Sequence, residues 1–180
     1  MFIAYHVIFT TYGTWLPNDP RGSYSKDIYT KQLQSLATVR YGRQNPQPDK
    51  KTLQKFWAVA GENTIRPPFF INDRTRPLVA SGFRTVINRL NIKVPACAIM
   101  NDHVHILIMR SKYRIEYLVN RLKGAATKEM KLECTIWTRS FRKIFINDTN
   151  TLSAAKYICA NPENSGLSPQ SWDFVTLLNV

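Results

Sequence analysis

Four stretches of the chain have the short apolar or alternating pattern that is typical of β-strands. Residues 2–11 are apolar, β-branched and aromatic, and residues 92–99 and 103–109 have the same character on either side of Asn101-Asp102. This polar pair suits a hairpin turn, so the second and third strands are predicted to be neighbours. A fourth strand is predicted around residues 141–146.

Two helices are predicted between these strands, because apolar residues recur three and four positions apart. They cover residues 78–90 and 114–132. The resulting order of strand, helix, strand, strand, helix and strand is the ferredoxin-like pattern of the α+β class. It predicts an antiparallel sheet with helices on one face, followed by a C-terminal helix.

A third helix is predicted over residues 152–160, with Asn150 or Thr151 as its N-cap and Pro162 ending it. At about 100° per residue, Leu152, Ala155 and Cys159 are predicted to share the apolar face. The remaining faces of this helix are then open to other roles.

The segment 13–76 contains many prolines and glycines, so we interpret it as an insertion within a single domain that spans residues 1–180. Short helices are expected near residues 26–39 and 50–59, the second docked by Leu53, Phe56 and Trp57. The insertion could grip DNA with Tyr41 between bases, or it could be a solvated cover over the sheet. Its basic residues include Arg40, Arg43, Lys50, Lys51 and Lys55.

The net charge of +13 over 180 residues favours a nucleic-acid partner, although a basic surface without a specific partner would look the same. The sequence has no apolar run long enough to span a membrane and no basic amphipathic end, so no membrane partner is expected. The N-terminus is interpreted as a strand and not as a signal peptide. Three scattered cysteines indicate reduced thiols in a cytoplasmic protein.

His103 and His105 flank Val104 at the start of the third strand. Alternate residues of a strand point to the same face and lie about 7 Å apart at their Cα atoms. Such a pair suits two ligands of one divalent metal, or it consists of two ordinary histidines of the sheet. The strongly apolar strand favours the first interpretation, because two imidazoles on one face need partners.

Tyr157 and Asn161 lie one helical turn apart on a face other than the apolar one. The phenol of Tyr157 can attack phosphorus, and the amide oxygen of Asn161 can ligate a metal. The alternative is that Tyr157 is a core aromatic residue.

A basic stripe is predicted on the second helix, where Arg114, Arg121 and Lys128 recur every seven residues. We interpret it as a track for DNA phosphates, against the alternative of an ordinary solvated face. The other basic residues that we expect to bind nucleic acid are Lys123, Arg139, Arg142 and Lys143.

Several motifs together resemble the single-tyrosine HUH transposases (IS200-like), and among them most closely the REP-associated tyrosine transposases. They are His103-Val104-His105, Arg121-Leu122-Lys123-Gly124, Trp137 with Phe141, and Tyr157-Ile158-x-x-Asn161-Pro162, with Tyr5-His6-Val7 near the N-terminus. The resemblance covers residues 1–12 and about 77–175.

The resemblance implies a metal-dependent enzyme that nicks and rejoins single-stranded DNA, at hairpin or REP-type sequences. Tyr157, on the C-terminal helix, would form a 5′-phosphotyrosine link and release a 3′-hydroxyl. His103, His105 and Asn161 would hold Mg²⁺ or Mn²⁺. The protein would act as a monomer or a homodimer, and His6 is expected to have a structural role although it could lie near the site.

The sequence also departs from the family pattern. Members often have Pro-Asn before the first histidine, where this chain has Asn101-Asp102. The third metal ligand varies among HUH enzymes, so Asn161 is transferred less securely than the histidines. The insertion at 13–76 is longer than in compact members.

Three other classes of protein remain open on the sequence. The first is a domesticated, non-catalytic DNA-binding protein. The second is an HUH replication initiator or relaxase, which the short chain disfavours. The third is a metal-dependent phosphoesterase that uses water as its nucleophile and would therefore tolerate Tyr157→Phe.

Overall fold

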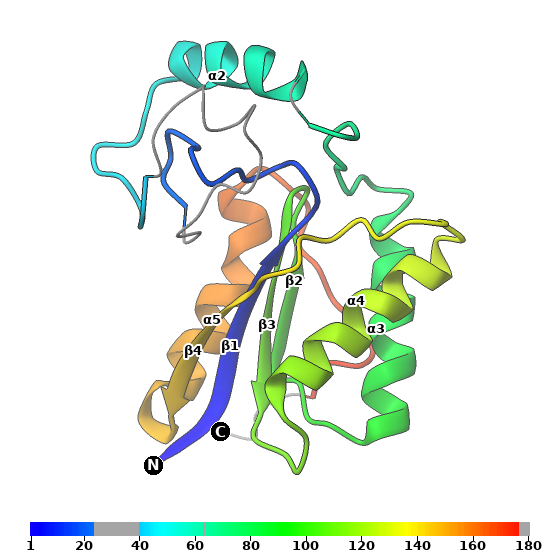
Figure 1. Cartoon of the computed structure of the whole chain (residues 1–180). Helices are drawn as coiled ribbons and strands as arrows, with labels where there is room; N and C mark the ends of the chain where they lie inside the picture. Colours follow the sequence, from blue (N-terminus) through cyan, green and yellow to red (C-terminus); the bar gives the residue numbers. More distant parts are fainter. Residues whose placement is uncertain (24–39, 63, 177–180) are drawn as a thin grey trace. The chain divides into compact units, whose positions relative to one another are not determined.

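The computed structural model describes residues 1–23, 40–62 and 64–176 (Figure 1). The chain divides into two compact units. The first, the sheet unit, consists of Met1–Thr10 and Phe70–Val180, and the second, the insertion unit, of Thr11–Phe69. The insertion unit overlaps most of the segment 13–76 that the sequence analysis interpreted as an insertion.

The sheet unit has the predicted order of elements. They are β1 (Phe2–Thr10), α3 (Arg76–Leu90), β2 (Ala96–Ile99), β3 (His103–Met109), α4 (Ile115–Glu129), β4 (Arg142–Asn147) and α5 (Asp148–Asn164). The four strands form one antiparallel sheet in the order β2-β3-β1-β4. This is the ferredoxin-like α+β topology, and it confirms the predicted fold class.

The two faces of the sheet bury different helices. Phe9 of β1 contacts Phe83 of α3 and Trp137, which precedes β4. On the opposite face, Ala4 of β1 and Leu107 of β3 share a core with residues of α5. Helices α3 and α4 therefore line one face and α5 lines the other, where it runs behind β1 and β4 in Figure 1.

Strand β2 is shorter than the predicted 92–99 and begins only after Pro95, whose nitrogen has no hydrogen to offer a ladder. The outer edge of β2 is covered by the C-terminal segment. The side chain of Gln170 exchanges two hydrogen bonds with the backbone of Ile99, at 2.8 and 2.9 Å, and the Thr176 amide donates to the Val94 carbonyl. Strand β4 is the other edge of the sheet.

Helix α5 differs from its predicted boundaries at both ends. It begins at Asp148, directly after β4, with Asn147 and not Asn150 or Thr151 at the N-cap position. It also continues through Pro162 to Asn164. Proline removes only its own N–H from the helix, so the amides beyond it still bond back, for example from Ser165 to the Asn161 carbonyl at 3.1 Å.

Lys123 of α4 and Trp137 of the loop before β4 hold that loop against the helix. Lys123 is buried, and its ammonium donates to the carbonyls of Thr138, Arg139 and Ser140 at 2.9 to 3.5 Å. The indole of Trp137 donates to the Lys123 carbonyl at 2.9 Å. Burial lowers the pKa of Lys123 to about 8. The prediction that Lys123 binds DNA is therefore wrong, because its three donors are used inside the protein.

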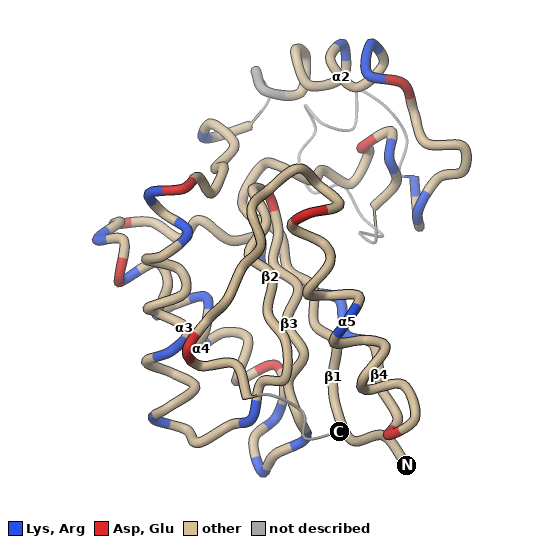
Figure 2. Tube along the Cα trace, turned by 180° about the vertical axis from the view of Figure 1, so that it is seen from behind, with Lys and Arg blue, Asp and Glu red and all other residues tan. Residues whose placement is uncertain are grey.

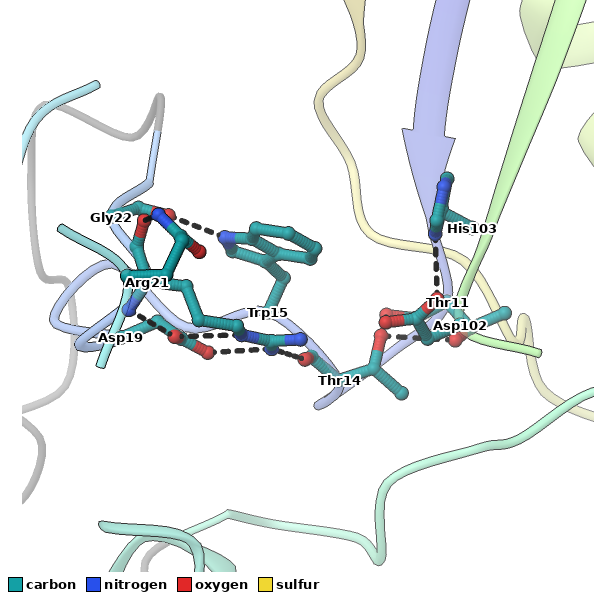
Figure 3. Close-up of polar contacts among 9 residues, drawn as sticks. Thr11, Thr14, Trp15, Asp19, Arg21, Gly22, Asp102 and His103 are labelled. Carbon is teal, nitrogen blue, oxygen red and sulfur yellow. Dashed lines mark hydrogen bonds and ion pairs between the residues drawn. The ribbon is translucent and has the colours of Figure 1, made fainter. Parts of the chain in front are cut away.

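The insertion unit contains helix α2 (Lys50–Glu62), which matches the helix predicted near 50–59, while the helix expected over 26–39 lies outside the described residues. Phe56 and Trp57 of α2 pack against Leu16 of their own unit. The nearby Arg21 forms a fork with the buried carboxylate of Asp19, at 2.7 and 2.9 Å, and stacks 4.0 Å from the centre of the Trp15 ring (Figure 3). Arg21 thus organises this unit.

None of the helices in the described part of the chain is both long and apolar enough to cross a membrane.

We expect Gly82→Ala to destabilise the fold, because a Cβ at Gly82 would lie 2.6 Å from the Ala126 nitrogen of α4. Backbone cannot move aside cheaply, so the free energy of unfolding should fall by about 1–3 kcal/mol. Gly124→Ala is the matched control, since a Cβ there meets nothing within 4 Å. It should be neutral or stabilising by up to about 1 kcal/mol. Urea titration of both variants measures the difference, and equal stabilities would contradict the close helix packing.

Candidate metal and nucleophile site

His103 and His105 lie side by side on the α5 face of the sheet, as the strand pattern predicted. Their Nε2 atoms are 3.0 Å apart. The residues between and after them, Val104 and Ile106, are fully buried. Strand alternation therefore points the two imidazoles to one face of the sheet and the side chains of Val104 and Ile106 to the apolar core on the other face.

The hairpin turn holds the first histidine from behind. The Met100 amide donates to the His103 carbonyl at 2.8 Å and closes the turn. Buried Arg76 donates to the Ile99 carbonyl at 2.9 Å and to the Asn101 side chain at 2.6 Å. Asp102, in the turn, accepts a hydrogen bond from His103 Nδ1 at 2.6 Å (Figure 3). The sequence analysis did not identify Asp102 or Arg76, because their roles depend on how the turn folds back.

His6 of β1 contacts the second histidine, with its Nε2 atom 2.9 Å from Nδ1 of His105. Both side chains are buried. Burial, and then the charge of Arg142, lower the pKa of His6 to about 4. Burial, followed by the charges of His103 and His6, lowers the pKa of His105 to about 3. Both imidazoles are therefore neutral near pH 7, and His6 belongs to the site.

The carboxylate of Asp102 fixes the direction of this chain of hydrogen bonds. A carboxylate can only accept, so His103 donates from Nδ1, and Nε2 is its remaining ring nitrogen. When Nε2 of His103 holds a lone pair, His105 donates to it from its own Nε2 and accepts at Nδ1 from His6. If His105 instead carries its hydrogen on Nδ1 and donates to His6, both Nε2 atoms of the pair present lone pairs.

The spacing of the pair fits a divalent cation. Two ligands at neighbouring corners of an octahedron with bonds of about 2.1 Å are separated by √2 times that length, about 3.0 Å. The observed Nε2 separation is 3.0 Å. Asp102 and His6 occupy the outer nitrogens, as carboxylates and other acceptors do around metal-bound histidines.

The third ligand would have to be of another type. Within the described residues, no three His, Cys, Asp or Glu side chains are grouped as a metal site. Asn161 donates its amide nitrogen to the Tyr157 carbonyl at 2.8 Å, which leaves Oδ1 as the atom it can offer to another group.

Tyr157 lies against the histidines on the exposed side of α5. Its ring centroid is 6.0 Å from that of His105 and 6.1 Å from that of His6, and its side chain is 56% exposed. The predicted apolar face of this helix was wrong in part, since Leu152 and Cys159 are exposed. The buried positions are Thr151, Ala155, Ile158 and Pro162. Tyr157 is nonetheless outside the core, as predicted.

The basic residues predicted to bind DNA are divided between the two faces. Arg114, Arg121 and Lys128 are exposed on α4, on the face opposite Tyr157. Arg142 lies close enough to His6 to lower its pKa. Lys143 pairs with Glu116 at 2.6 Å, and Arg139 is exposed. Figure 2 shows that Lys and Arg outnumber acidic residues along α3, α4 and the adjoining loops.

Comparison with solved structures gives nine matching chains, and two of them, both distant in sequence, are as follows. The structure of a REP-associated tyrosine transposase bound to a REP hairpin is 13% identical, with a TM-score of 0.49, and the match covers 97% of this chain and 78% of that one. The structure of a candidate transposase from Deinococcus radiodurans R1 is 15% identical, with a TM-score of 0.39, covering 93% and 94%. A search of curated proteins gives no match.

The family comparison is more specific. The model described as "Transposase IS200 like" matches residues 64–161, more than half of the chain. The matched segment includes the histidine pair, the two motifs that lock α4 to the following loop, and Tyr157 with Asn161. This chain belongs to the IS200-like transposase family.

Proposed function

We propose that this protein is a metal-dependent endonuclease and strand transferase for single-stranded DNA, with Tyr157 as its nucleophile. The observation that carries the proposal is the position of an exposed phenol beside His105, whose Nε2 atom lies 3.0 Å from that of His103. The phenol and a cation held by the two histidines could then act on the same phosphate group.

The chemistry exchanges one phosphodiester for another. The Tyr157 oxygen attacks phosphorus and loses its proton to water, while the bond from phosphorus to the 3′ oxygen breaks and that oxygen takes up a proton. The products are a 5′-phosphotyrosine and a free 3′-hydroxyl. No high-energy cofactor is needed, because the reverse attack by a 3′-hydroxyl restores a phosphodiester and frees Tyr157.

His103, His105 and Asn161 would hold Mg²⁺ or Mn²⁺. When bound, such a cation supplies a Lewis acid that polarises the scissile phosphate and offsets its developing charge. Asp102 holds the His103 ring with its Nε2 lone pair toward the site. His6 does the same for the second ring when His105 carries its hydrogen on Nδ1 and donates it to His6 Nε2.

Single-stranded DNA is the proposed substrate because an exposed tyrosine on a helix surface needs an accessible phosphate. The sequence resemblance to REP-associated transposases makes a strand flanked by a hairpin the first substrate to test. The basic residues on both faces of the sheet unit supply long-range attraction for such a polyanion.

Two alternatives make different predictions for the same variant. A phosphoesterase that uses water would still cleave DNA after Tyr157→Phe, without ever forming an adduct. A non-catalytic DNA-binding protein would bind oligonucleotides with either residue at 157 and cleave none of them.

We expect Tyr157→Phe to abolish a covalent protein–DNA adduct while leaving DNA binding and folding nearly unchanged. The change removes one oxygen from a side chain that is 56% exposed, so little stability depends on it. The measurement is denaturing gel electrophoresis after incubation with hairpin-flanked single-stranded DNA and Mn²⁺. An adduct of undiminished yield in the variant would exclude Tyr157 as the nucleophile.

We expect His103→Ala and His105→Ala each to weaken Mn²⁺ binding by more than tenfold, because each removes a nitrogen of the 3.0 Å pair. Asn161→Ala should have a smaller effect, since water can replace one amide oxygen. Electron paramagnetic resonance of free Mn²⁺ measures this without any turnover. Tyr157→Phe is the control that should bind Mn²⁺ as the wild type does, and wild-type affinity in both His variants would refute the metal site.

We expect Arg121→Glu to weaken single-stranded DNA binding and to flatten its salt dependence by about 0.7 in the logarithmic slope, as one phosphate contact is lost. Arg89→Glu makes the same charge change at an exposed position of α3, outside the α4 stripe, and should leave the slope unchanged. Affinities at several salt concentrations separate the two. Identical slopes for both variants would move the DNA path away from α4, with the basic 40–55 segment as the next region to test.

A further inference from the structure

Three aromatic side chains form a cluster on the sheet face that does not carry Tyr157. Phe2, Tyr5 and Phe145 contact one another with ring centroids 5.0 to 5.6 Å apart. Phe145 is 56% exposed, and the other two are partly exposed. We call these three residues the aromatic platform. The ferredoxin-like core does not need it, since the buried clusters are formed by other residues.

Strand alternation places Tyr5 and Phe145 on the face opposite Tyr157, and the register shift between Phe2 and Ala4 brings Phe2 beside them. Tyr5 lies between Ala4 and His6, which both point toward α5. Phe145 likewise lies between Ile144 and Ile146, which pack in the core beneath α5. The platform therefore lies on the same face as α3 and α4. In Figure 1 these helices are displaced toward β2 and β3, so β4 lies outside their cover.

The surroundings of the platform are cationic. The guanidinium of Arg110 lies 5.1 Å from the centre of the Phe2 ring. Lys143, which precedes Phe145 by two residues, and exposed Arg114 both approach Glu116. An anionic partner is therefore favoured at this surface.

Exposed aromatic rings beside lysine and arginine suit nucleic-acid bases better than an apolar protein surface. Every base has a flat π-face that can stack on such a ring, while the nearby cations meet the phosphates. An obligate protein interface would instead be expected to contain few charges at its centre. The observations thus favour a strand whose bases are unpaired.

We propose that the aromatic platform stacks unpaired bases of the single-stranded DNA whose scissile phosphate lies at Tyr157. The DNA strand passes around the edge strand β4, where alternation sends Arg142 toward the His6 face and Lys143 toward the platform face. Bases some distance from the cleavage point are then held on the far side of the sheet. This inference rests on the function proposed above and adds a second contact region for the same substrate.

The test compares three substitutions of Phe145 in binding a labelled single-stranded oligonucleotide by fluorescence anisotropy. Phe145→Ala and Phe145→Leu should each weaken binding by about fivefold or more, the lower limit for one lost base stack. Phe145→Trp should keep or increase the affinity, because a larger π-face remains. Leucine preserves the apolar surface, so wild-type binding by Phe145→Leu would overturn the stacking proposal.

Abasic oligonucleotides make the corresponding change in the DNA, because an abasic site removes one base and keeps every phosphate. When the abasic site is moved along the oligonucleotide, wild-type affinity should fall at one or two positions away from the cleavage point. At those same positions the abasic site should not lower the affinity of Phe145→Ala any further. Equal sensitivity of wild type and Phe145→Ala at every position would overturn the proposal. Thermal unfolding confirms that the variants fold.

Two further measurements keep this inference separate from its rivals. Failure of the wild type to form any adduct on hairpin-flanked single-stranded DNA would refute the Tyr157 mechanism and not the platform's DNA contact. Sedimentation shows whether the platform joins two copies of the chain. A wild-type dimer that Phe145→Ala converts to monomers, without a change in DNA affinity, would overturn the proposal.

Discussion

The antiparallel register of β1 with β3 is the constraint on which the site depends. It pairs Ile8 with His105 and His6 with Leu107, so His6 and His105, which both face α5, come from adjacent strands and meet diagonally. Their nitrogens are 2.9 Å apart as a result. A shift of one residue in this register would point the polar side chains of one strand into the apolar core. The cost of burying them strongly favours the observed pairing.

Around this pair, the protein uses buried polar groups to position backbone. Arg76 secures the turn that contains Asp102, and Lys123 gathers three carbonyls of the loop before β4. That loop leads directly into β4 and then into α5, where Tyr157 lies. Removing either cation would release the segment that it holds, so these residues carry a structural role that surface charges do not.

The remaining positive charge is spread over two faces of the sheet unit and has a different purpose. The α4 stripe, the platform surroundings and Arg142 form no single patch beside Tyr157. A short ligand would use only part of this surface. A flexible polyanion that bends around β4 could meet all of it, and this agreement between charge and topology links the proposed chemistry to the proposed platform.

The sequence by itself determined the fold class, the order of the strands and helices, and the shared face of His103 and His105. Each of these follows from local periodicity, which the chain carries in its spacing of apolar residues. It also indicated that Tyr157 is outside the core, although the apolar stripe assigned to α5 was shifted and its ends were misplaced. Capping and proline signals are short-range, and the direct passage from β4 into α5 overrode them.

Only the tertiary structure decided which residues surround the site. Helical spacing puts Lys123, four residues after Val119, on the buried side of α4 and Arg121 away from it, but only the fold brings three loop carbonyls to the Lys123 ammonium. His6 is 99 residues from His105 in the chain, and Phe2 and Phe145 are farther apart still. Contacts of this kind are set by strand order and register, which depend on the whole sheet closing around its core and not on any segment alone.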